Sequence, residues 1–295
     1  MPELSGVFGV KIDALFDCPE ETHLRRIEAM LERETMLSRP DFDYAASRLK
    51  EGLEQPDTRG RCLTLLADLY LHRAQGYADL AGNYAQRALE AEPEKKDNHL
   101  ILNKARHGVL PDWSFSNHTR LIDYYKEFVE KHPDYLPGYL WLMDNLIADH
   151  RLTEADQAAE RMHQVEQTYH YPLYKGWIAF YAGDVAEAER LWTEMTDGDS
   201  NNWFAWSARA DTCAHRAMYR EAIAFYREAI SRQAPPRYPD NEDSIAQLCL
   251  LLGDYAGAAD AYAQVLEILR EDWGLTEGET VQGYEENIAF CNSRL

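Results

Sequence analysis

The strongest constraint on the fold of this chain is a set of alanines that recur at a nearly fixed interval in its C-terminal half. Ala155, Ala188, Ala222 and Ala258 are separated by 33, 34 and 36 residues. The last three are each followed, four residues later, by an aromatic residue: Trp192, Tyr226 and Tyr262. A helix-length unit that recurs at this period is typical of proteins built from stacked helical repeats.

The order of small and bulky residues within one period resembles the tetratricopeptide repeat (TPR) family, a helix-turn-helix unit of about 34 residues. Its pattern places a bulky and then a small residue in helix A. Helix B then has a small residue, an aromatic and a second small residue. In the unit of Ala222 these places hold, in order, Trp206, Ala210, Ala222, Tyr226 and Ala229. Helices cross closely only where side chains are small, and one pair cannot bury its apolar face alone, so units stack.

The resemblance implies an all-α fold: a right-handed superhelical solenoid of antiparallel helix pairs, with about six to seven pairs and a C-terminal capping helix. Gly76-Tyr77 is expected to be a turn between two short helices. The predicted organisation is an N-terminal arm (1–18), irregular helical repeats (19–109), a connector loop (110–116), regular repeats (117–270) and the capping helix (271–295).

The charge balance limits the classes of partner. The 295 residues include 51 acids against 30 Lys and Arg, a net charge of −21. Nucleic acids and anionic membranes are bound by clusters of Lys and Arg, so both are excluded as partners. An acidic chain favours basic partners, although solubility alone also explains the charge. No run approaches 18 apolar residues, and the five cysteines contain no CxxC pair. We therefore expect a cytoplasmic protein without a membrane span.

The search for chemistry finds no catalytic motif of the common types. His163 and His170 would lie on nearly one helix face, and Asp211 with His215 could orient an imidazole. An acidic group follows at residues 240–243. Solvated side chains, a surface ion pair and helix-end acids are the simpler explanations of these three features, and we prefer them. We predict no catalytic residue, no metal site and no cofactor, and hence no enzyme.

The resemblance also implies a concave groove, lined by one face of each helix A, in which a peptide lies. Aromatic side chains there would supply contact area, and acids would pair with Lys or Arg. The alternative is that the aromatic side chains pack between helices. The candidate groove residues are Asp144, His170, Leu173, Trp177, Tyr181, Phe204, Ser207, Asp211, His215, Asp243 and Gln247.

The sequence thus favours a non-enzymatic protein-interaction scaffold or adaptor that binds a basic or apolar-basic peptide or partner protein. One subclass of the family clamps a C-terminal carboxylate with Lys and Asn from helix A. The matching positions here are Leu173, Trp177, Ser207 and Asp211, which do not carry that pair. An alternative is a small-molecule sensor or enzyme with its site in the same groove. Self-association is a third hypothesis.

Overall fold

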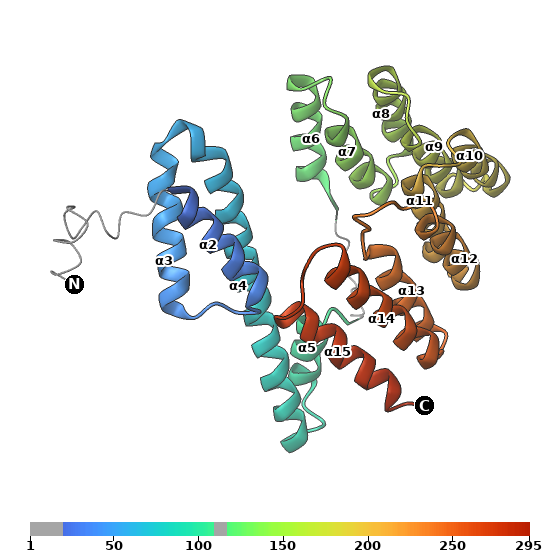
Figure 1. The fold of residues 1–295 in the computed structure, drawn as a ribbon. Coiled ribbons are helices and arrows are strands. Elements are labelled where there is room, and N and C mark those ends of the chain that lie inside the picture. The colour runs from blue at the N-terminus through green and yellow to red at the C-terminus, as the bar shows by residue number, and fades with distance from the viewer. Residues whose placement is uncertain (1–19, 109–116) are drawn as a thin grey trace. The chain divides into compact units, whose positions relative to one another are not determined.

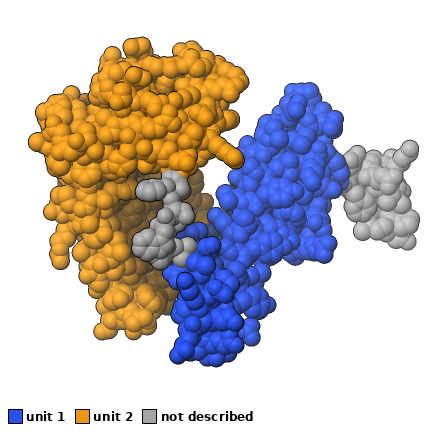
Figure 2. All heavy atoms as spheres, turned by 180° about the vertical axis from the view of Figure 1, so that it is seen from behind, with its two compact units in different colours: residues 1–113, 277–282 blue, residues 114–276, 283–295 orange. Residues whose placement is uncertain are grey.

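A computed structural model describes residues 20–108 and 117–295 of the chain, so the expectations for the arm 1–18 and the connector 110–116 lie outside the described residues. Within these ranges the elements are fourteen α-helices, α2 to α15, and one short 3₁₀-helix (Figure 1). No helix in them is long and apolar enough to cross a membrane. Contacts group the chain into two compact units (Figure 2): Met1–Trp113 with Glu277–Gln282, and Ser114–Thr276 with Gly283–Leu295.

The first unit consists of helices packed around one long helix. Its described elements are α2 (Glu20–Arg33), α3 (Arg39–Glu51), the 3₁₀-helix η2 (Gly52–Glu54), α4 (Pro56–Ala91) and α5 (Lys96–Ala105). Apolar side chains of α2, α3 and α4 form its core, among them Leu24, Ile27, Leu49, Leu65 and Leu69. Pro56 stands in the first turn of α4, where its missing N–H leaves no bond unmade.

The turn predicted at Gly76-Tyr77 is wrong, because α4 continues through it as one helix of 36 residues. Gly76 is buried against the side chain of Met36, and a Cβ there would lie 2.8 Å from the Met36 Cγ. Glycine inside a helix costs about 1 kcal/mol relative to alanine. This close approach, together with the unbroken helical hydrogen bonds, offsets that cost.

The second unit is a series of antiparallel helix pairs. Its helices are α6 (Thr119–Lys131), α7 (Leu136–Ala148), α8 (Leu152–Val165), α9 (His170–Tyr181), α10 (Val185–Gly198), α11 (Trp203–His215), α12 (Tyr219–Ile230), α13 (Asp240–Leu251), α14 (Tyr255–Glu271) and, from Gly283 onward, α15 (Glu279–Asn292). The main pairs are α7 with α8, α9 with α10, α11 with α12 and α13 with α14. The first helices of successive pairs also touch, α7 against α9 and α9 against α11. These first helices therefore lie side by side on one face of the second unit. On α15, Tyr284, Ile288 and Cys291 pack onto the last repeat, as expected of a capping helix.

The alanine repeat is confirmed. Ala155, Ala188, Ala222 and Ala258 are each the fourth residue of their helix, in α8, α10, α12 and α14, and none has exposed surface. The turn before each helix repeats as well. Five residues before each alanine stands a residue with positive φ: His150, Gly183, Ala217 and Gly253. Backbone and side chains therefore follow the same period.

Candidate functional site

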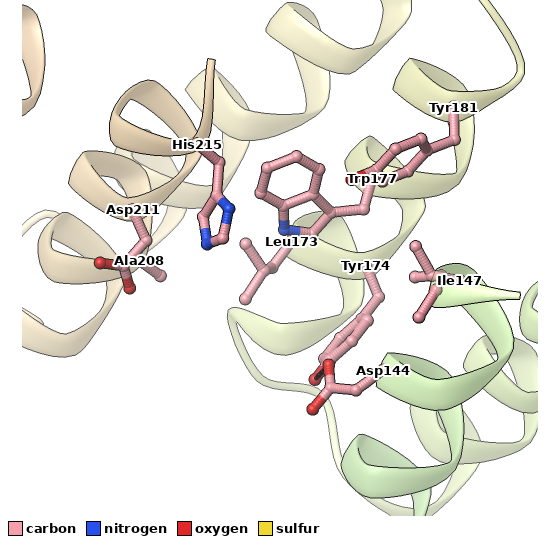
Figure 3. A pocket seen from close by; sticks show the side chains of 10 residues that line it. Asp144, Ile147, Leu173, Tyr174, Trp177, Tyr181, Ala208, Asp211 and His215 are labelled. Carbon is pink, nitrogen blue, oxygen red and sulfur yellow. Dashed lines mark hydrogen bonds between the residues drawn. The ribbon is translucent and has the colours of Figure 1, made fainter. Parts of the chain in front are cut away.

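The first helices of three successive pairs line a pocket of about 340 Å³, the α7–α9–α11 pocket (Figure 3). Residues three or four apart on a helix share a face, so each helix contributes a short series of side chains. The lining residues are Asp144, Ile147 and Ala148 from α7, Leu173, Tyr174, Trp177 and Tyr181 from α9, and Ala208, Asp211 and His215 from α11.

Trp177 is the centre of the aromatic wall of this pocket. Its indole stacks on Tyr181 at 5.9 Å between ring centroids and meets the His215 ring edge-on at 5.6 Å. Behind it, the fully buried Trp192 makes an edge contact at 5.0 Å. His150 packs edge-on against Tyr181 at 5.2 Å. Since the ring is held by several neighbours, the wall is a fixed aromatic surface.

Asp144 forms one acidic side of the pocket. The Tyr174 hydroxyl, on a side chain only 7% exposed, donates a hydrogen bond of 2.7 Å to the Asp144 carboxylate. Partial exclusion of water raises the pKa of Asp144, against the lowering effect of that hydrogen bond. Burial and the nearby carboxylate in turn raise the pKa of Tyr174, which keeps it a hydrogen-bond donor.

Asp211 forms the other acidic side. Its carboxylate accepts a hydrogen bond from the Tyr226 hydroxyl of α12, so the donor is Tyr226 rather than His215. Desolvation raises the pKa of Asp211, and the effects of Tyr226 and His215 oppose this. In Figure 3 the His215 imidazole is turned toward Trp177, whereas the Asp211 carboxylate lies beside Ala208.

The ten lining residues include two carboxylates and no Lys or Arg. Each carboxylate accepts a hydrogen bond from a tyrosine hydroxyl, and none of the lining residues is a Lys or Arg that would neutralise its charge. A cation that entered would meet both acids and the face of an aromatic ring, each of which attracts positive charge.

The structure brings together six of the eleven groove residues predicted from sequence. These are Asp144, Leu173, Trp177, Tyr181, Asp211 and His215. The other five do not line this pocket: His170, Phe204, Ser207, Asp243 and Gln247.

Three of these five residues form hydrogen bonds with side chains of neighbouring helices. Ser207 donates a 2.6 Å hydrogen bond to Asn241. Gln247 donates one of 3.0 Å to the Tyr262 hydroxyl. Asp243 is hydrogen-bonded by Tyr284, and desolvation raises its pKa. The Ser207 bond joins two repeats, the Gln247 bond joins the two helices of one repeat, and Asp243 is bonded by the capping helix.

The remaining two lie near the starts of their helices. Phe204 is half exposed and stacks on Trp203 at 3.7 Å. His170 bonds the Thr168 hydroxyl at 2.9 Å, and burial lowers its pKa. His163, its expected companion, stacks on Tyr171 at 4.0 Å. Among the described residues no group of three or more His, Cys, Asp or Glu side chains could hold a metal ion.

Sequence reasoning missed four lining residues: Ile147, Ala148, Tyr174 and Ala208. Each lies three or four residues from a correctly chosen neighbour, Asp144, Trp177 or Asp211, and so on the same helix face. That spacing could have identified all four as lining residues. The bond from Tyr174 to Asp144, which joins two repeats, has no such local signal.

Replacing both pocket acids, in Asp144→Asn with Asp211→Asn, is expected to raise the thermal midpoint at pH 7. A raised folded-state pKa means that the ionised carboxylate destabilises the fold. This penalty is fully present above the raised pKa values and absent below the ordinary Asp value of about 3.9. The gap between variant and wild type should therefore narrow as the pH falls, as differential scanning calorimetry from pH 7 to pH 4 would show.

The matched control is Asp134→Asn with Asp197→Asn, which removes the same charge from exposed positions outside the pocket. An equal rise in both double variants would mean that relief of the overall negative charge is responsible. It would contradict a penalty specific to the pocket.

Comparison with known proteins finds no matching family model and no matching curated sequence. Solved structures do resemble the chain. A tetratricopeptide repeat protein from Parabacteroides merdae matches with a TM-score of 0.43 and 13% identity over 92% of this chain and 98% of its own. Yeast Tom70 matches with a TM-score of 0.40 and 11% identity over 94% of this chain and 64% of its own. YrrB, described as a TPR protein with an unusual peptide-binding site, matches with a TM-score of 0.33 and 12% identity over 65% of this chain and 96% of its own. On the contacts of its own helices, this chain has an all-α fold of successive TPR-like helix pairs.

Proposed function

We propose that this chain is a non-enzymatic protein-interaction module that binds a basic or apolar-basic segment of a partner protein across α7, α9 and α11. The observation that carries the proposal is the α7–α9–α11 pocket, in which Asp144 and Asp211 face an aromatic wall without any Lys or Arg among the lining residues. Stacked helix pairs commonly present such a face to other proteins.

The pocket suits a single cationic side chain of that segment. An arginine or lysine would bring its charge to the two carboxylates and its apolar stem to Leu173 and Trp177. Part of the cost of binding is already met, because the rings and the tyrosine-bound acids are held in place before the ligand arrives.

The test uses fluorescently labelled peptides that carry one arginine, each paired with the same peptide in which citrulline, a neutral isostere, replaces that arginine. Anisotropy should show weaker binding of the citrulline peptides. The Asp144→Asn, Asp211→Asn double variant should lose about tenfold or more in affinity for the arginine peptides, because both charge-assisted contacts disappear.

The exposed double variant Asp134→Asn, Asp197→Asn is the control and should bind as the wild type does. If citrulline and arginine peptides bind equally, or if both double variants weaken equally, the cation pocket is refuted. Circular dichroism of Trp177→Ala with Asp211→Ala provides the second control, since loss of helicity would identify these residues as core rather than binding surface.

A small cationic molecule is the second candidate ligand. The pocket volume of about 340 Å³ falls at the lower end of the range for small-molecule sites, about 300–1,000 Å³. Free arginine methyl ester that binds as tightly as the peptides would favour this sensor or enzyme reading, because the rest of the peptide would then contribute nothing.

A further inference from the structure

The long helix α4 presents an apolar stripe to solvent along most of its length. Leu63, Tyr70, Tyr77 and Tyr84 recur at intervals of seven residues and are 52%, 50%, 51% and 65% exposed. An alanine stands four residues after each of them: Ala67, Ala74, Ala81 and Ala88. These eight positions are named the α4 seam.

Most of the seam lies outside the surfaces by which α4 packs into its own unit, although Tyr70 meets the Phe42 ring of α3 edge-on at 5.5 Å. The buried residues of α4 lie on other sides of the helix. Cys62, Leu65 and Leu69 pack with α2 and α3. Gly82 lies against α5, where a Cβ would be 3.4 Å from the Cβ of Ala105. Helix α4 therefore carries apolar side chains on its solvent side as well as on the sides that its own unit covers.

The spacing of the seam is that of a coiled coil. Its members alternate at steps of four and three residues, which places them at the a and d positions of a heptad repeat. Every d position holds Leu or Tyr and every a position holds Ala. Such a stripe fits another helix with the same repeat.

The residues beside the seam carry no negative charge. The positions before each alanine are Leu66, Arg73, Leu80 and Arg87. Those after each large residue are Thr64, Leu71, Ala78 and Ala85, of which Ala85 is buried in the chain's own unit. In a chain of net charge −21 this absence is informative, because carboxylates here would repel a second copy at contact distance. The remaining surface charge acts at longer range, where salt screens it.

We propose that α4 pairs antiparallel with α4 of a second copy of this chain, with Ala74 opposite Tyr77 of the other copy. A parallel pair would stack thin Ala–Ala layers between thick Tyr–Tyr layers. The antiparallel pair matches one small with one large residue in every layer, which fills space evenly. In this one register Ala81 faces Tyr70, Ala67 faces Tyr84 and Ala88 faces Leu63.

The same register separates the cations. Arg73 then lies beside Leu80 of the second copy, and Arg87 beside Leu66, so no two guanidinium groups meet. The seam from residue 63 to residue 88 is about 38 Å long at 1.5 Å per residue. With its flanks it offers fewer residues than the roughly 20–30 per side of a standard interface, so the affinity expected is moderate.

The test is the mass of the full chain in solution, by sedimentation velocity and light scattering from about 1 to about 100 µM. The wild type should move from 34.0 kDa towards twice that mass as concentration rises. Ala74→Glu puts a carboxylate in the seam and should raise the dissociation constant about 30-fold or more. Gln75→Glu adds the same charge one residue away, outside the seam, and should leave it nearly unchanged.

Orientation is tested by disulfide formation in a Cys18→Ser background. Mixing the Ala74→Cys and Tyr77→Cys proteins should give a cross-linked pair, because paired layers bring these positions within disulfide range. Cross-linking of Ala74→Cys alone would show a parallel pair and overturn the register.

Three other outcomes would also overturn the proposal. One is a monomer over the whole concentration range, and another is a dimer that Ala74→Glu leaves intact. The third is a wild-type monomer that becomes a dimer on deletion of residues 1–18, which would assign the seam to the chain's own N-terminal segment.

Discussion

Gly176→Ala is expected to lower the free energy of unfolding by about 3 kcal/mol, although alanine favours helices by about 1 kcal/mol over glycine. A Cβ on residue 176 would lie 2.2 Å from Nε1 of Trp192 and 2.6 Å from its Cδ1. The indole has no exposed surface, and its N–H donates a hydrogen bond of 3.1 Å to the Leu173 carbonyl oxygen. The ring therefore cannot move aside without losing that bond and its packing, so α9 and α10 must separate.

Gly60→Ala on α4 is the matched control. It is the same substitution within a helix, but no atom lies within 4 Å of the added methyl group, so helix propensity alone should stabilise the chain slightly. Urea denaturation followed by circular dichroism would measure both. Equal stability of the two variants would contradict the close contact of α9 with α10 through Gly176.

The repeat could be predicted from sequence because its causes are local. Ala188, Ala222 and Gly176 are small because two helices of one pair touch there, and those helices lie within one period of the sequence. The turn before each second helix is also determined by residues close by in the sequence, so its backbone geometry repeats with the helix that follows. Helix existence and register in residues 117–295 were therefore accessible from composition and spacing alone.

Helix α4 was mispredicted for a physical reason. Gly76 acts as a helix breaker only where nothing compensates it, and the compensating Met36 side chain comes from a segment 40 residues earlier. A period of seven, visible at Tyr70, Tyr77 and Tyr84, was present in the sequence. A prediction that divides this stretch into two short helices makes no use of that period.

The pocket was half predicted. Position in the repeat identifies the face of helix A, which is why Asp144, Trp177 and Asp211 were found. It does not reveal which polar groups on that face are satisfied by another helix, as Ser207 and Gln247 are. Those bonds depend on side-chain geometry between helices, about which the repeat pattern carries no information.

Two arginines with little exposed surface depend on one carboxylate in the second unit. Arg209 of α11 and Arg216, just after it, have side chains 10% and 9% exposed, and both bond Glu189 of α10. The Arg216 guanidinium also lies 4.7 Å from the Trp192 ring centroid. Desolvation would raise the pKa of Glu189, but its bonds to the two arginines outweigh this and hold the pKa below its ordinary value.

Glu189→Gln should therefore lower the free energy of unfolding by about 2–4 kcal/mol at pH 7. The substitution leaves two poorly solvated guanidinium groups without a counter-charge. Breaking a buried ion pair costs about 3–5 kcal/mol. Because the Glu189 side chain is 37% exposed, we expect a smaller loss of stability here. Because the folded-state pKa of Glu189 is lowered, the stability advantage of the wild type is complete above the ordinary Glu pKa and shrinks as the pH falls below about 4.3.

The control is Glu194→Gln, which removes an exposed partner of Arg190 and should change the free energy of unfolding little. Adding Arg216→Met to Glu189→Gln should recover part of the loss in urea titrations; a further loss would show that packing of Arg216, rather than its unpaired charge, sets the stability.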